Sequence, residues 1–222
     1  MRILKFTLPF LLITINSCGQ KKTIHKTNPE VARLTRQIIP LISYVDNADS
    51  CKKALSFLDS ATAIDSNCFS CYQEKLMFLN SLKQYNKIFS TIDTCIKIRP
   101  NAHDLYLTAG ILHEKYGDTI SSKPYFTKSL RICNLVLDTM QTSNKNYPMF
   151  STNKAINLIM LGDSVQANKI LKDLYESQPD NPEFDNLEKK YTLSLMNKNK
   201  AQLIDLLTDQ EKISQTISPN EK

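Results

Sequence analysis

A short pattern that returns after 34 residues limits the fold of this chain more than any other feature. Residues 64–67 (IDSN) are followed at that distance by residues 98–101 (IRPN). The same register extends over four units, which begin at Thr35, Phe69, His103 and Pro148. The last start lies 45 residues after the third, so 11 extra residues separate units three and four. A fixed spacing of this length indicates repeated pairs of helices that stack and bury one another's apolar faces.

Glycines mark the expected turn inside two of the helix pairs. Gly117 and Gly162 occupy the same position of units three and four, and an aspartate follows each of them. Glycine ends a helix in the left-handed conformation, and an aspartate in the next position is a good N-cap. Asp118 and Asp163 are therefore predicted to cap the second helix of their units.

The units resemble the tetratricopeptide repeat (TPR), in which two antiparallel helices pack through a few positions of defined size. The aromatic position of the first helix holds Tyr72 and Tyr106, and the small position that lets the helices approach holds Gly110 and Ala155. The resemblance covers residues 29–208, with a degenerate terminal unit from Pro182. It implies an all-α, TPR-like α-solenoid of about four to five antiparallel helix pairs.

This register predicts a helix for most of the chain and no strand. Only 4 glycines occur in 222 residues, which argues against a protein built from strands and tight turns. The predicted helices cover residues 29–46, 50–64, 68–82, 84–98, 102–116, 119–141, 149–161, 163–177, 183–197 and 199–208.

The resemblance also implies where a partner binds. In TPR proteins the first helices line a concave groove that takes a protein or peptide segment. The matching positions here hold Gln73, Met77, Asn80, Leu107, Thr108, Ile111, Lys115, Thr152, Asn153, Ile156, Ile159 and Met160. We expect an extended or helical segment of another protein to bind this surface. The alternative is that flanking helices of the chain itself cover it.

The first 18 residues have the layout of a secretory leader. Arg2 and Lys5 precede an apolar run over residues 6–15, which is shorter than the roughly 20 residues that a membrane-spanning helix needs. Residues 15–18 (INSC) resemble the lipobox of bacterial lipoproteins. The resemblance implies removal of residues 1–17, a lipid on Cys18 and a cell-envelope location, and Gly19 favours the outer membrane facing the periplasm. An ordinary signal peptide with an incidental cysteine is the alternative.

The segments on either side of the helical region are polar. We expect residues 18–28 to form a flexible tether and residues 209–222 to form a frayed tail. The helical domain is then predicted over residues 29–208.

Five cysteines remain in addition to Cys18. Cys71 and Cys95 fall on opposite positions of a helix pair, so we predict that they face each other, where they could form a disulfide in an oxidising compartment. Cys68 and Cys71 also form a CxxC motif, which offers an alternative function as a redox or metal-binding protein. Zinc needs further ligands, and no second Cys or His pair at metal spacing accompanies the motif, so no metal site is predicted.

The remaining features exclude several classes of function. The net charge of +6 is spread along the chain without a dense basic cluster, so nucleic-acid binding is not expected. The sequence carries no nucleophile elbow, phosphate-binding loop or dinucleotide motif. We therefore expect no catalytic residue and no cofactor. The expected partners are a protein or peptide and, through Cys18, a lipid bilayer.

Overall fold

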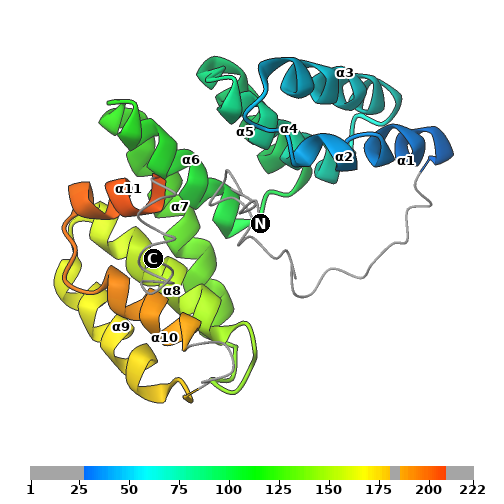
Figure 1. Ribbon diagram of the computed structural model, residues 1–222. Coiled ribbons are helices and arrows are strands. Elements are labelled where there is room, and N and C mark those ends of the chain that lie inside the picture. The colour runs from blue at the N-terminus through cyan, green and yellow to red at the C-terminus, as the bar shows by residue number, and fades with distance from the viewer. Residues whose placement is uncertain (1–27, 181–185, 209–222) are drawn as a thin grey trace, which may run out of the picture. The chain divides into compact units, whose positions relative to one another are not determined.

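The computed structural model describes residues 28–180 and 186–208, and all the regular structure in those ranges is helical (Figure 1). The prediction of an all-α, TPR-like fold is confirmed for this part of the chain. The helices form two compact units that divide between Pro100 and Asn101. Cys18, the leader, the tether up to residue 27 and the tail over 209–222 lie outside the described residues. Their assignment, and that of residues 29–208 as a single domain, stays a prediction.

Within residues 28–100, unit 1 contains five helices. They are α1 (Pro29–Arg36), α2 (Ile39–Ile42), α3 (Ala48–Ile64), α4 (Phe69–Ser81) and α5 (Tyr85–Ile98). α3 packs against α1, α2 and α4, and α4 packs against α5. Val31, Leu58 and Phe78 come from three different helices and are all buried in one apolar cluster. Burial of such side chains is the main stabilising contribution to a helix pair.

One helix expected in unit 1 is interrupted. The sequence predicts a single helix over residues 29–46, whereas α1 ends at Arg36 and α2 spans only Ile39–Ile42. Pro40 is the cause, because it has no N–H to donate to the carbonyl of Arg36 and its ring would clash with that carbonyl. Proline is tolerated in the first turn of a helix, which is the position of Pro40 in α2.

Unit 2 contains the remaining six helices among the described residues. They are α6 (His103–Lys115), α7 (Thr119–Leu137), α8 (Tyr147–Leu161), α9 (Ser164–Ser177), α10 (Leu187–Leu195) and α11 (Lys200–Thr208). Each helix from α6 to α9 packs against the next one, and α10 packs against α9. α11 then turns back and packs against α6, as Figure 1 shows.

The helix boundaries reproduce the predicted repeat. α4 and α6 begin at Phe69 and His103, and α5 and α7 begin at Tyr85 and Thr119, so both pairs of starts are 34 residues apart. α9 begins 45 residues after α7, at Ser164. The extra residues lengthen α7 to 19 residues, against 14 in α5, and form the connection to α8. This is the arrangement that the sequence predicts for the insertion.

The turns inside the helix pairs of unit 2 are also as predicted. Gly117 and Gly162 have φ angles of 84° and 97°, which L side chains rarely adopt. The Asp118 carboxylate accepts a hydrogen bond from the backbone N–H of Ser121 at 3.1 Å. The equivalent bond from Asp163 caps α9. These two turns fix where α7 and α9 begin.

Candidate functional site

The predicted groove positions of unit 2 lie on α6 and α8, and we call this surface the α6–α8 face. It comprises Leu107, Thr108, Ile111 and Lys115 of α6 and Thr152, Asn153, Ile156, Ile159 and Met160 of α8, together with Glu114 of α6, which is not among the predicted groove residues. α6 and α8 are the first helices of consecutive pairs and also contact each other directly. The structure thus brings together the groove residues that the sequence assigns to units three and four.

The apolar part of the α6–α8 face is not open to solvent. Leu107, Ile156, Ile159 and Met160 are all buried, with at most 6% of each side chain exposed. They belong to one apolar cluster that also contains Leu203 and Leu206 of α11, with Ile111 packed against it. The expectation that these side chains line an open groove is therefore wrong for this structure. In this structure the side chains pack instead with residues of α11, a flanking helix of the chain itself, as the alternative expected.

Polar contacts fix α11 at the C-terminal end of α6. The Glu114 carboxylate, of which only 4% is exposed, lies 2.5 Å from Nζ of Lys200 and also accepts a hydrogen bond from the hydroxyl of Ser122. Lys115 donates from Nζ to the backbone oxygen of Thr208 at 3.4 Å. An ion pair with one buried partner is costly to break, because the remaining charge loses its compensation. The two ends of α11 are thus each held by a residue of α6.

No sequence signal marks the Glu114 contacts in advance. Lys200 lies 86 residues from Glu114, in the terminal pair whose packing positions depart most from the repeat. Lys115 is a predicted groove residue, but its partner is the backbone oxygen of Thr208, which any residue at that position would offer.

Asn153, a polar residue of the α6–α8 face, is half-buried and forms a hydrogen bond within unit 2. The Nδ2 atom of Asn153 lies 3.0 Å from Nε2 of His103. The His103 ring stacks on the Phe150 ring, with 4.3 Å between the ring centroids. Burial lowers the pKa of His103, and the nearby Asp104 carboxylate offsets this only in part. The ring is therefore neutral at pH 7, and Nε2 accepts the hydrogen bond of the amide.

A chain of hydrogen bonds continues from His103 through the core of unit 2. Asn157 donates from Nδ2 to the Ser129 hydroxyl at 2.8 Å, and this hydroxyl donates to the His103 carbonyl oxygen at 2.8 Å. The chain links α8, α7 and α6 inside the core, and Oδ1 of Asn157 is buried there without a hydrogen-bond partner. Burial raises the pKa of the adjacent Cys133 thiol to about 12. Cys133 therefore stays protonated at neutral pH and is a poor nucleophile.

Unit 1 places its three predicted groove residues on α4. Met77 is buried in the core of this unit, whereas Gln73 and Asn80 are half-buried. Glu74 lies next to Gln73, and burial raises the pKa of its carboxyl group. The side chain of Met77 thus contributes to packing within unit 1, and only the two amides keep access to solvent.

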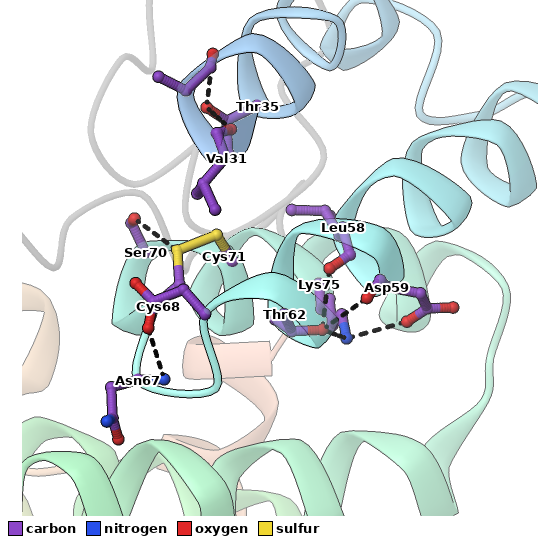
Figure 2. Close-up of a disulfide and its surroundings, with 12 residues drawn as sticks. Val31, Thr35, Leu58, Asp59, Thr62, Asn67, Cys68, Ser70, Cys71 and Lys75 are labelled. Atoms are coloured by element: carbon purple, nitrogen blue, oxygen red, sulfur yellow. Dashed lines mark hydrogen bonds and ion pairs between the residues drawn. A yellow bond between two sulfur atoms is a disulfide. The ribbon is translucent and has the colours of Figure 1, made fainter. Parts of the chain in front are cut away.

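The cysteine pairing differs from the prediction. Cys68 and Cys71 form a disulfide with 5.3 Å between their Cα atoms, and Cys95 is a buried thiol outside it (Figure 2). The predicted Cys71–Cys95 disulfide is therefore wrong. Cys68 is the N-cap of α4, and its non-helical backbone turns its side chain toward the residue three positions later. This local approach removes the partner that Cys95 would need.

The disulfide lies inside unit 1, under α1. Figure 2 shows Val31 of α1 pointing toward the sulfur atoms, and both cysteines belong to the core cluster with it. On the other side, Lys75 bridges α4 to α3: its Nζ lies 2.9 Å from the Asp59 carboxylate and donates to the Thr62 hydroxyl at 2.7 Å. Cys71 has no exposed surface, and Cys68 has only 8%. These surroundings suit a structural crosslink.

The described residues offer little for a metal ion or a membrane span. Across residues 28–180 and 186–208, no three His, Cys, Asp or Glu side chains are placed to hold a metal ion. Within the same ranges, no helix has both the length and the apolar character that crossing a bilayer requires.

Comparison with known proteins gives similarity at the level of solved structures. No family model and no curated protein matches the chain. One similar structure is YrrB, described as a TPR protein with an unusual peptide-binding site, with 16% identity, a TM-score of 0.46 and coverage of 88% of this chain and 91% of that one. Another is PilW, described as a widely conserved type IV pilus biogenesis factor, with 16% identity, a TM-score of 0.47 and coverage of 88% and 96%. The antiparallel helix pairs and their 34-residue spacing make the described part of this chain an all-α protein with a TPR-like fold.

Proposed function

We propose that this protein is a non-enzymatic scaffold that binds a segment of another protein on the α6–α8 face. The observation that carries the proposal is that this face already holds a helix, α11, through buried leucines and through the ion pair between Lys200 and Glu114. A surface that packs one amphipathic helix has the shape and chemistry to pack another.

The same proposal includes attachment to a membrane. The leader, the apolar run and the residues around Cys18 support acylation at that cysteine, which would tether the helical units to a bilayer of the bacterial cell envelope. Several acyl chains give stable anchoring, since each buried CH₂ contributes about 0.8 kcal/mol. A scaffold held there can act in envelope assembly.

Recovery of partners from solubilised membranes tests the binding face. Lys115→Glu reverses a charge on the exposed rim of the α6–α8 face, and Lys169→Glu makes the same change at an exposed position of α9. Because Lys115 also holds α11 through Thr208, we expect Lys115→Glu to change recovery of the partner several-fold in one direction or the other, and Lys169→Glu to leave it unchanged. Equal recovery with both variants and with the unaltered protein would rule out this face.

A separate experiment tests the anchor. Cells grown with an alkyne-tagged fatty acid should yield labelled protein in the membrane fraction, and Cys18→Ser should abolish both the label and the membrane association. If the unaltered protein is unlabelled and leaves the membranes on washing, the anchor proposal fails while the binding proposal remains testable.

The alternative function is a redox role for Cys68 and Cys71, and their disulfide is the observation that favours it. A redox-active pair must react while the protein is folded, whereas a buried crosslink is reduced only when unit 1 opens. Thiol labelling after treatment with dithiothreitol, with and without urea, distinguishes the two. Rapid reduction of the folded protein would support the redox role, and reduction only in urea would leave a structural disulfide.

A further inference from the structure

α11 has the composition of a helical ligand more than that of a core helix. It spans nine residues, KAQLIDLLT, and its buried leucines, Leu203 and Leu206, are three positions apart on one side. Ile204 and Leu207 are partly buried against the same cluster, whereas Ala201 and Gln202 are exposed. This is the spacing by which amphipathic helices anchor in the groove of another protein.

The place where α11 binds is also unusual for a terminal helix of a stack. Its principal packing partner is α6, the first helix of unit 2, although α10 precedes it in the chain. It reaches α6 after a turn in which Asn197 has a φ angle of 58°. Its Leu203 and Leu206 belong to the same apolar cluster as side chains at the groove positions of the repeat, such as Leu107 and Ile156. α11 thus occupies the surface on which we propose that a partner binds.

The charge at the end of this surface restricts what can replace α11. The Glu114 side chain is almost fully buried and is compensated by Lys200, with the Ser122 hydroxyl as its second partner. If another segment covered Glu114 in place of α11 without supplying a cation, the buried carboxylate would be uncompensated, which is strongly unfavourable. A segment that replaces α11 must therefore bring a cation to Glu114 as well as apolar side chains to the cluster.

We infer that α11 occupies the binding site of the partner's helix and is displaced when that helix binds. The inference rests on the proposed function and names the chemistry of its partner: an amphipathic helix with Lys or Arg three residues before the first of two large apolar side chains, themselves three residues apart. This pattern is that of Lys200, Leu203 and Leu206. Since a short connection keeps α11 at an effective concentration of the order of millimolar, a free segment of equal intrinsic affinity binds poorly until α11 is weakened.

A peptide added in trans tests the displacement. The probe is a fluorescein-labelled synthetic peptide of residues 199–208, and the receptor is the full chain carrying Leu203→Ala and Leu206→Ala, which weaken the docking of its own α11. We expect the peptide to bind this variant at least tenfold more tightly than the unaltered protein, because the intramolecular competitor is lost. The matched control is the same peptide with Lys200→Glu, which should bind at least tenfold more weakly to the variant.

The role of Glu114 is tested in the same assay. Adding Glu114→Gln to the two leucine substitutions should weaken binding of the original peptide. It should also reduce the receptor's preference for the original peptide over the Lys200→Glu peptide. An unchanged preference would overturn the assignment of Glu114 as the group that selects a cation. If the leucine variant keeps its helical circular dichroism but binds the peptide no better than the unaltered protein does, displacement is overturned.

If the leucine variant does not fold, hydrogen exchange on the unaltered protein tests whether α11 can leave its site. A displaceable α11 opens locally, so its amides should exchange at least tenfold faster than those of α8. Equal protection of α11 and α8 would show that α11 opens only with the rest of unit 2 and would overturn the inference. Partner recovery from membranes is independent of both measurements, so it separates failure of the displacement from failure of the scaffold.

Discussion

Gly110→Ala probes the closest approach of α6 and α7. A Cβ atom at position 110 would lie 2.6 Å from Cε1 and 2.8 Å from Cδ1 of Phe126, whereas carbon pairs prefer about 3.5–4.0 Å. Phe126 is only 1% exposed, so its ring has little room to move away. Overpacking of a core costs up to about 3 kcal/mol, and replacing a helical glycine by alanine returns about 1 kcal/mol. We expect a net loss of about 2 kcal/mol in the free energy of unfolding.

Urea denaturation followed by far-UV circular dichroism measures this loss. The matched comparison is a double-mutant cycle with Phe126→Leu, which removes the ring edge that the new methyl group meets. Gly110→Ala should cost clearly less in the Phe126→Leu background, because the clash is then relieved. A neutral or stabilising Gly110→Ala, or a cycle that is additive within error, would refute the close packing of these two helices.

The remaining predictions concern the core of unit 2, the disulfide and one turn. Burial lowers the pKa of His103, so below about pH 6.5 the native state binds fewer protons than the unfolded state, and the free energy of unfolding should decline. His103→Gln should flatten this decline in a pH series of urea titrations. Replacing both Cys68 and Cys71 by serine should lower the unfolding free energy by about 2 kcal/mol or less, since the disulfide closes a very short loop, and a larger loss or none would contradict this account. Gly162→Ala should cost about 1 kcal/mol in thermal or urea unfolding, because alanine is strained at a φ of 97°, and a neutral result would argue against the left-handed turn.

Most of the helix boundaries could be predicted because local chemistry determines them. Gly162 and Asp163 end one helix and cap the next without help from distant residues, and their positions in the sequence are enough to locate the turn. Pro40 is an equally local signal, because a proline at this position ends the preceding helix. The helix expected over residues 29–46 is therefore an error of interpretation.

The state of the binding face could not be predicted from the repeat. Assigning Ile156 to a groove position says which way its side chain points but not what lies over it. The cover comes from α11, through contacts such as Lys200 with Glu114 that join residues far apart in the chain. The disulfide was missed for the opposite reason: Cys68 and Cys71 approach through a local non-helical turn, whereas the prediction favoured contacts across the helix pair.

Site-specific photo-crosslinking in the native host tests the central claim most directly. The photoreactive residue p-benzoylphenylalanine is placed at Lys115, on the rim of the α6–α8 face, and at Val165, an exposed position of α9 that serves as the control. The account predicts two products from position 115, an intramolecular link to α11 and an adduct with one discrete envelope protein, and no such adduct from position 165. An adduct that forms only from position 165, or no link to α11 from position 115, would contradict it.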